Sequence, residues 1–321
     1  ENVESVSNCN QGLELSSGIQ NLSVLSSKLN NNTSVGVRKG TAAIVNGFTM
    51  TNCEVKGNNQ GFFIAKNNGA GGTFENVNIT NSDLSNNLQK GMYFEALSNA
   101  VLDGIIMDNS GTDATYANNN GIDINLKYGS YNSITIKNSE ITNCGSVGTA
   151  TLPEHPAAIA VKARDDGGYA GNPATLDIVI VTNNIISGPQ NGIRFGESGK
   201  INTGPTNVSV TGNDLSAFFA YKAFVNNTNA TNIATCNWWG SPASGLIASK
   251  ITGDVYYNPW YTTGGDETSL GFQPTGTCEG EPVLITSAVA DHIICGEATG
   301  SITVTFDGGF APYDITWTGG G

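Results

Sequence analysis

The sequence has little charge, and positive charge is the scarcer kind. Charged residues make up 13% of its 321 residues, with 14 lysines and arginines against 27 aspartates and glutamates, which gives a net charge of -13. A chain this acidic, with no basic stripe, repels the phosphates of nucleic acids and anionic membranes, so we expect no nucleic-acid partner. No apolar run approaches the roughly 18 residues that a membrane-spanning helix needs, so we expect no membrane span.

Cysteine and histidine are also scarce. The chain has six cysteines and two histidines, with no Cys-x-x-Cys pair and no histidine cluster, which excludes the common zinc and redox motifs. Cys278 and Cys295 are the pair that we would most readily expect to form a disulfide, and Cys236 looks solitary. The other cysteines each follow an asparagine and are expected to be small stacked residues in different repeats: Cys9, Cys53 and Cys144.

Residues 1–241 lack any run of ten or more residues with the periodicity of an amphipathic helix, which excludes solenoids built from helices. They contain instead a short phrase, a small residue followed by alternating apolar positions, that returns every 24 to 37 residues. Such alternation, broken by Gly, Asn, Asp and Ser, is typical of strands, and strands at this period predict an all-β, right-handed parallel β-helix. The phrase begins at residues 12, 36, 61, 91, 121, 158, 192 and, in degenerate form, 221.

The alternation also predicts which side chains point inward. We expect the apolar positions of each phrase to stack on their equivalents in the next coil, at the roughly 4.8 Å spacing of neighbouring strands. The predicted core residues are Leu13, Leu15, Val37, Phe62, Ile64, Met92, Phe94, Ile122, Ile124, Ile159, Val161, Ile193 and Phe195.

Asparagines recur where the strands are expected to end. Asparagine tolerates left-handed backbone, and its amide can bond to the coils above and below, so we expect a structural asparagine ladder and no ligand role. In the later repeats the asparagine moves one place along the phrase. The residues concerned are Asn52, Asn81, Asn109 and Asn138, and then Asn183 and Asn213.

Aromatic residues gather where the repeat stops. The pattern Asn-Trp-Trp-Gly at 237–240, followed by Gly-x-Val-x-Tyr-x-Pro-Trp at 253–260, departs from the phrase. An open solenoid end exposes unpaired strand edges and must be covered, so we expect the β-helix at 1–241 and an end-cap at 242–261. The pattern resembles the closing motif of secreted bacterial right-handed parallel β-helix proteins of the pectin-lyase-like superfamily, a resemblance that implies the fold and the cap but no activity.

Residues 262–277 are rich in Gly, Thr and Pro and are expected to form a linker. After them, 278–321 predicts a partial immunoglobulin-like module, with a hairpin of strands at 302–306 and 313–317. The pattern from Cys295 to Trp317 resembles the SprB-type repeat of Bacteroidetes gliding-motility surface adhesins. That resemblance implies a section of a longer protein with further modules, secreted to the bacterial outer cell surface by type IX secretion.

The outward positions of the phrases form two rows across the coils. The first row is Glu14, Arg38, Phe63, Tyr93, Asp123, Ala160 and Arg194; the second is Ala65, Glu95, Asn125, Lys162 and Gly196, with Arg164 and Glu197 close by. Aromatic and charged groups on consecutive coils are what a polysaccharide groove requires, and insertions at 145–156, with His155, and at 165–173 would wall it. We therefore predict surface glycans or polysaccharide as partners, contacting Phe63, Tyr93, Asp123, Asn125, Lys162 and Arg194.

The sequence leaves open whether this groove is catalytic. β-Helix polysaccharide lyases remove the proton α to a uronic-acid carboxylate with a lysine or arginine, and the resemblance makes Lys162, beside Arg164 and Arg194, the candidate base. Glu95, Asp123 and Asn125 would then be candidate oxygen ligands for Ca²⁺. Ordinary cross-strand pairs with no catalytic role are the better explanation of alternating acid and base.

These patterns favour a section of a large secreted cell-surface adhesin or extracellular appendage. Its β-helix would be a stiff rod that displays a carbohydrate- or surface-binding face. Two alternatives stand beside this hypothesis: a polysaccharide lyase that cleaves uronate-containing polymers by β-elimination, and a subunit of a homo-oligomeric fibre.

Overall fold

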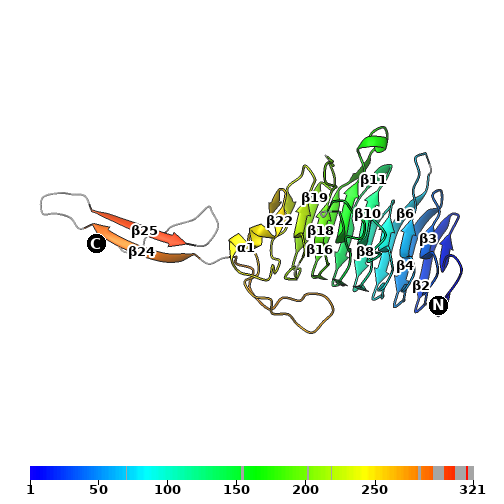
Figure 1. The fold of residues 1–321 in the computed structure, drawn as a ribbon, viewed down its shortest axis with the longest axis horizontal. Coiled ribbons are helices and arrows are strands. Elements are labelled where there is room, and N and C mark those ends of the chain that lie inside the picture. Colours follow the sequence, from blue (N-terminus) through cyan, green and yellow to red (C-terminus); the bar gives the residue numbers. More distant parts are fainter. Residues whose placement is uncertain are drawn as a thin grey trace.

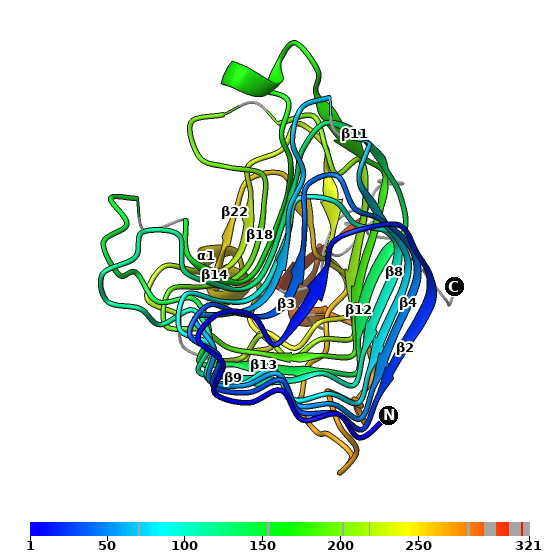
Figure 2. The same cartoon turned by 90° about the vertical axis from the view of Figure 1, so that its right-hand side faces the viewer.

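The computed structural model describes residues 1–69, 71–152, 155–200, 202–217, 219–280, 283–291, 300–307 and 316. Short strands follow one another around successive coils, and each pairs in parallel with its equivalent in the next coil, which confirms the predicted parallel β-helix (Figure 1). Viewed along the solenoid, the strands of successive coils lie over one another and loops of different length project beyond them (Figure 2). No helix of the described residues is long and apolar enough to cross a membrane.

Two nine-stranded sheets run along the described solenoid. Sheet 1 carries the repeated phrases and contains, in order, β1 (Leu13–Leu15), β3 (Val35–Lys39), β5 (Gln60–Ile64), β7 (Lys90–Phe94), β10 (Asn120–Leu126), β14 (Ala157–Ala163), β18 (Asn191–Phe195), β20 (Lys222–Asn226) and β22 (Ile251–Thr252). Sheet 2 contains β2 (Ile19–Leu25), β4 (Ile44–Thr51), β6 (Thr73–Thr80), β8 (Ser98–Asp103), β12 (Ile134–Lys137), β16 (Ile178–Thr182), β19 (Asn207–Thr211), β21 (Asn232–Ile233) and β23 (Val255–Tyr256).

Smaller elements complete the coils. A third sheet crosses the turn after sheet 2 and consists, in the described residues, of β9 (Ile106–Asp108), β13 (Glu140–Thr142) and β17 (Ile185–Ile186). Two longer coils add a further parallel pair, β11 (Gly129–Tyr131) with β15 (Ala174–Leu176), and the loop before β15 carries the short 3₁₀ helix η1 (Gly167–Tyr169).

The core lies between the sheets and follows the predicted rows. Every position predicted to face inward is buried, apart from Leu13, which is half-buried in the first strand of sheet 1. Phe62 and Phe94, on neighbouring coils, have ring centroids 6.1 Å apart. Burying an aliphatic or aromatic side chain stabilises a fold by about 1.5–3 kcal/mol, so these stacked rows supply the main driving force for coil formation.

The predicted left-handed backbone is confirmed for five of the six asparagines, all except Asn213, and the predicted ladder is corrected in most of its members. Asn52, Asn81, Asn138 and Asn183 all have positive φ after strands of sheet 2, whereas Asn109 follows β9 and belongs to a different turn. Of the predicted residues, Asn213 belongs to a buried ladder, and Asn109 and Asn138 donate to neighbouring coils at Asn86 and Asp103. The buried, inward-facing ladders are Asn32, Asn58 and Asn87 at one place, and Asn184, Asn213 and Asn237 at the other.

One core position holds a lysine. Lys39 aligns with Leu15 and Ile64 in an inward row of sheet 1 and is fully buried. Its Nζ donates to the backbone oxygens of Gly40, at 2.9 Å, and Ala65, at 3.1 Å. Burial, and then the neighbouring charge of Lys66, lower the pKa of Lys39 to about 8.

We expect Lys39→Met to raise the free energy of unfolding by roughly 1–3 kcal/mol at pH 7, because the buried charge disappears. The pKa of Lys39 is lower in the folded than in the unfolded chain, so the penalty is fully present below pH 8 and is relieved as pH rises from 8 towards 10.5. The advantage of the variant over wild type should therefore shrink over that pH range. Urea unfolding at pH 7 and pH 10 measures both effects.

A matched control is Arg38→Met on the opposite face of the same strand. Arg38 forms an exposed ion pair with Glu14 at 3.2 Å, which contributes about 0–1 kcal/mol and should show no such pH dependence. A Lys39→Met variant less stable than wild type at pH 7 would show that the two carbonyl hydrogen bonds outweigh the cost of burying the charge.

The C-terminal end of the solenoid is closed by residues after 241. Helix α1 (Ser244–Ser249) precedes β22 and β23, which extend sheets 1 and 2 by one strand each. Trp239 and Trp260 are fully buried in this last coil. Residues 262–277, expected as a linker, fold back along the turns: the N–H of Phe272 donates to the backbone oxygen of Asn183 at 3.1 Å, and the Phe272 side chain is buried.

A disulfide joins this returning segment to the solenoid. Cys236 bonds to Cys278 across 42 positions of sequence. The predicted pairing of Cys278 with Cys295 is therefore wrong, and so is the solitary Cys236; Cys295 itself lies outside the described residues. The repeated strand pattern does not predict the path of the irregular residues 262–277, and that path determines which cysteine lies next to Cys278. The remaining cysteines comprise two that are buried, as expected, and one that is exposed: Cys53, Cys144 and Cys9.

Beyond the solenoid, the described residues form one antiparallel pair. β24 (Leu284–Asp291) pairs with β25 (Ser301–Asp307), so the strand predicted at 302–306 is confirmed. In the described residues β25 pairs with β24, which precedes it in the sequence. The strand predicted at 313–317 lies outside the described residues except for position 316.

Candidate functional site

The outward face of sheet 1 carries the predicted stripe. Strand pairing places Glu14, Arg38, Phe63, Tyr93, Asp123, Ala160 and Arg194 opposite one another on consecutive coils. Asn125 and Lys162 are likewise paired in the second row. The sequence therefore predicted the register of this face correctly, because a two-residue alternation fixes which side chains share a face.

A groove of about 310 Å³ runs over this face, and the walls come from loops that project past the sheet. All six residues predicted to contact a ligand line it, as do Arg164 and Glu197. His155 from the first predicted insertion and Tyr169 from the second lie on its walls. The described residues that line it are Gln60, Phe63, Lys90, Tyr93, Glu95, Tyr116, Asn118, Asn120, Asp123, Asn125, Lys127, His155, Lys162, Arg164, Tyr169, Arg194 and Glu197.

Aromatic rings form the end of the groove nearer the N-terminus. The rings of Phe63 and Tyr93 have centroids 5.4 Å apart, and Nζ of Lys90 lies 4.0 Å from the Tyr93 centroid. Burial raises the pKa of Tyr93 well above its ordinary value, so its hydroxyl stays protonated and donates to Glu95 at 2.9 Å. Phe63 also borders a shallower hollow that reaches Arg38, so the groove continues along the sheet.

Asp123 lies at the centre of the groove and is almost fully buried. Its Oδ2 accepts hydrogen bonds from Nζ of Lys90 and from Nδ2 of Asn120. Burial alone would raise the pKa of Asp123, but the positive charges of Lys90, Lys162 and Arg194 outweigh it and hold the pKa below its ordinary value. Asp123 is therefore ionised at neutral pH.

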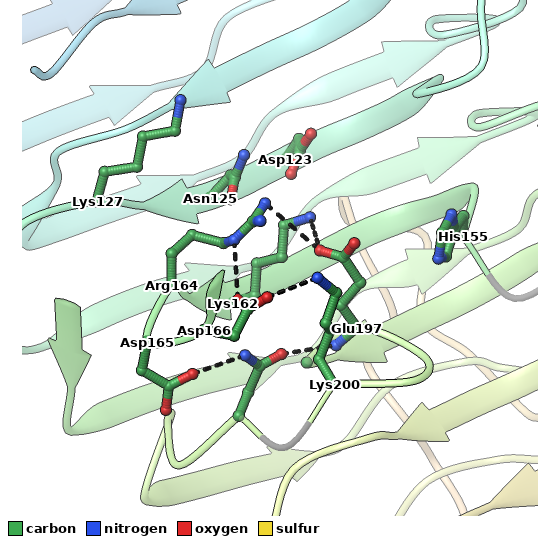
Figure 3. Close-up of polar contacts among 12 residues, drawn as sticks. Asp123, Asn125, Lys127, His155, Lys162, Arg164, Asp165, Asp166, Glu197 and Lys200 are labelled. Carbon is green, nitrogen blue, oxygen red and sulfur yellow. Dashed lines mark hydrogen bonds and ion pairs between the residues drawn. The ribbon is translucent and has the colours of Figure 1, made fainter. Parts of the chain in front are cut away.

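The other end of the groove is a network of charges from two coils and the loops after them (Figure 3). Lys162 Nζ lies 2.7 Å from Glu197 Oε2, and Arg164 lies 3.5 Å from the same oxygen. Arg164 also pairs with Asp166 at 3.4 Å, and Lys200 pairs with Asp166 at 2.6 Å. Asp166, predicted only as part of a loop, thus links Arg164 to Lys200.

Arg194 is the most buried cation of this end, with 2% of its surface exposed. Its guanidinium donates to the backbone oxygen of His155 at 3.0 Å and to that of Gly196. Burial, and then the neighbouring charge of Arg194, lower the pKa of Lys162 to about 8. The two cations therefore lie close together in a poorly solvated part of the groove.

The predicted Ca²⁺ site does not fit the structure. Glu95 is bonded by Nζ of Lys127 and the hydroxyl of Tyr93, and Asp123 is bonded by Lys90. Ca²⁺ takes six to eight oxygen ligands, whereas both carboxylates are paired with lysines and the three predicted residues leave only Oδ1 of Asp123 and Oδ1 of Asn125 without a hydrogen-bond partner in the described structure. No group of three His, Cys, Asp or Glu that could hold a metal occurs in the described residues.

A third row of groove residues was not among the predicted site residues. Gln60, Lys90 and Asn120 are paired across coils, and each stands just before the small residue that begins a phrase. This constant position in each phrase could have identified these residues from the sequence. Tyr116 and Asn118, by contrast, come from an irregular loop that no periodicity describes.

Comparisons with known proteins bear on both parts of the chain. The family model described as "SprB repeat" matches residues 287–321. No curated protein sequence matches the chain. Among solved structures, the chain is similar to the catalytic unit of a thermostable GH87 alpha-1,3-glucanase from Streptomyces thermodiastaticus strain HF3-3, with 19% identity, a TM-score of 0.44 and coverage of 82% of this chain. The chain spans about half of that structure's length, 49%.

Proposed function

We propose that this chain is a section of a cell-surface adhesive protein whose β-helix binds polysaccharide in the groove of sheet 1. The observation that carries the proposal is the set of aromatic and hydrogen-bonding side chains that lines the groove on consecutive coils, with Phe63, Tyr93, Asp123 and Arg194 from the stripe and Lys162 on the coil where the stripe has Ala160. Coils repeat at about 4.8 Å, a distance comparable to one sugar unit of an extended polysaccharide. A polymer laid along the solenoid would place successive sugar units against successive coils, from the aromatic pair at one end to the charged residues at the other.

The chemistry of the lining supports a sugar ligand. Aromatic faces such as Phe63 and Tyr93 pack against the apolar faces of pyranose rings, and the amides and charged groups beyond them can bond to hydroxyls. A strand-built platform holds these groups in place before the ligand arrives, which lowers the entropy cost of binding.

The match of residues 287–321 to an SprB repeat supports the cell-surface part of the proposal. In this role the solenoid is a stiff spacer on the bacterial outer surface, and further modules of the same chain carry it. Its partners would be surface glycans or polysaccharide in the surroundings of the cell.

The aromatic platform gives a direct test. We expect Phe63→Ala to weaken polysaccharide binding about tenfold, because one ring contact contributes about 1–1.5 kcal/mol. Affinity electrophoresis of the whole chain in gels that contain pectate, alginate, chondroitin sulfate or dextran measures the change. Tyr256→Ala, an exposed tyrosine on β23 outside the groove, is the matched control and should leave binding unchanged. Equal losses in both variants, or no retardation in any gel, would contradict the proposal.

A polysaccharide lyase is the second candidate function, and the lowered pKa of Lys162 favours it. A lysine that loses its proton near pH 8 can take the proton α to a uronate carboxylate, while Arg194 stabilises the charge that develops on that carboxylate. Turnover would appear as ultraviolet absorbance of unsaturated uronate products, would rise as pH increases through about 8, and would be abolished in Lys162→Met. Flat traces with all acidic polymers would leave binding as the function of the groove.

A further inference from the structure

We infer that the groove selects an acidic polysaccharide and binds its carboxylate or sulfate groups at Lys162 and Arg194, with neighbouring sugar hydroxyls bonded to Asp123 and Asn125. This inference rests on the proposed polysaccharide binding and adds the chemical class of the ligand and its placement across β10, β14 and β18.

The first argument is the local sign of the charge. The whole chain carries 14 basic against 27 acidic residues. Of the described side chains that line the groove, five are cationic and three are carboxylates: Lys90, Lys127, Lys162, Arg164 and Arg194 against Glu95, Asp123 and Glu197. A cationic groove on an acidic molecule concentrates anions at one place and repels them elsewhere, so it favours a polymer with regularly spaced negative groups.

The second argument is the cost of the cation cluster without a ligand. Lys162 and Arg194 come from neighbouring strands, and their mutual repulsion contributes to the lowered pKa of Lys162. Glu197 is shared between Lys162 and Arg164, and Arg164 has Asp166 as a second partner. Poorly solvated like charges destabilise each other, and a bound anion would relieve that repulsion.

The third argument concerns two buried acceptors beside the cations. Asp123 and Asn125 are 3% and 8% exposed, and in the described structure Oδ1 of each lacks a hydrogen-bond partner. Leaving such an atom without a donor costs about 1–3 kcal/mol, so the arrangement favours a ligand that supplies donors. Asn125 is paired with Lys162, and Asp123 lies two coils from Arg194 in the stripe. Sugar hydroxyls next to an acidic group offer this combination.

The ligand class is tested with matched polymers in the presence of a chelator, which removes bridging Ca²⁺. Dextran and dextran sulfate share a backbone and differ in sulfate, and alginate carries carboxylates alone. We expect dextran to leave migration of the whole chain unchanged, at least one of the two anionic polymers to retard it, and the retardation to fall as salt is raised from 50 to 300 mM. Alginate alone would identify carboxylate as the ligand group, and dextran sulfate alone would identify sulfate.

Variants locate the anion. Lys162→Met should weaken binding of the retarding polymer about tenfold or more, whereas Lys137→Met, which removes a surface cation of sheet 2 that is paired with Asp103, should not change it. Glu197→Gln removes the shared carboxylate and should tighten binding severalfold, a gain that damage to the fold would not produce. If Lys162→Met fails to fold, the binding change in Glu197→Gln tests whether the anionic group binds at this cluster.

The possible failures are distinguishable. Equal retardation by dextran and dextran sulfate would overturn the acidic-ligand inference and leave polysaccharide binding standing. Weaker binding in Glu197→Gln would also overturn it, because the carboxylate would then contact the ligand itself. The absence of binding to every polymer, neutral or acidic, would remove the proposed function together with the inference.

Discussion

Asp123→Ala is expected to lower the free energy of unfolding by about 3–5 kcal/mol, the usual cost of leaving one member of a buried ion pair alone. Asp123 and Lys90 have side chains only 4% and 5% exposed, so water cannot replace the lost partner. Asn120 would lose an acceptor as well. Urea unfolding followed by circular dichroism measures the change.

The same substitution should alter the response to acid. The pKa of Asp123 is lower in the folded protein than in the unfolded chain, so its contribution to stability is present above about pH 4 and is lost as pH falls further. The variant should therefore differ most from wild type near neutral pH and least in acid.

Two controls accompany this prediction. Asp103→Ala breaks an exposed pair with Lys137 at 3.2 Å and should cost no more than about 1 kcal/mol. The double variant Lys90→Met with Asp123→Leu removes both charges and should recover most of the stability. If Asp123→Ala were as mild as the surface control, the groove would be far better solvated than its burial indicates.

Asn58→Ala is the second variant with a large expected effect, a loss of about 3–5 kcal/mol, because four buried groups lose a hydrogen bond and a buried group left without a partner costs about 1–3 kcal/mol. The Asn58 Oδ1 accepts from the backbone N–H of Asn32 at 2.9 Å and from the Asn32 side chain at 3.0 Å. Its Nδ2 donates to the backbone oxygen of Leu29 at 3.0 Å and to Oδ1 of Asn87 at 3.1 Å. Thermal and urea unfolding report the loss.

The adjacent residue supplies the control for this ladder variant. Asn59 is half-buried, and its side chain makes a single 3.4 Å contact with Gln89, so Asn59→Ala should change stability by less than about 0.5 kcal/mol. Comparable losses of stability in the two variants would mean that the asparagine ladder contributes little to stability and that the apolar rows alone hold the coils in register.

The rows of sheet 1 could be predicted from sequence because apolar and polar residues alternate within each repeated phrase. The alternation shows which side chains point inward and which point outward. The same reasoning fails where a polar or charged side chain occupies an inward position that is apolar in the neighbouring coils. Lys39 stands in an apolar row, and only its hydrogen bonds to Gly40 and Ala65 explain why it is tolerated there. The lysine partners of Asp123 and Glu95 could not be predicted, because pairing across coils depends on side-chain reach that the alternation does not encode.

Irregular segments are the second part of the structure that the sequence pattern could not predict. The strand pattern predicts the asparagine ladder at the turn residues, most of which have left-handed backbone, whereas the buried ladders consist of amides that point into the interior and share only Asn213 with the predicted set. The path of residues 262–277 depends on contacts such as that of Phe272 with Asn183, which are specific and non-repeating. The disulfide partner of Cys278 followed from that path and from nothing in the spacing of the cysteines.

The disulfide between Cys236 and Cys278 also determines how the molecule responds to pulling. Helix α1 and strands β22 and β23, which close the last coil, lie within the loop of chain that the disulfide closes. Tension that enters through residues after Cys278 therefore passes through the sulfur bridge to Cys236 and bypasses the closing segment. Force applied there therefore cannot peel the last coil off the solenoid strand by strand while the disulfide is intact.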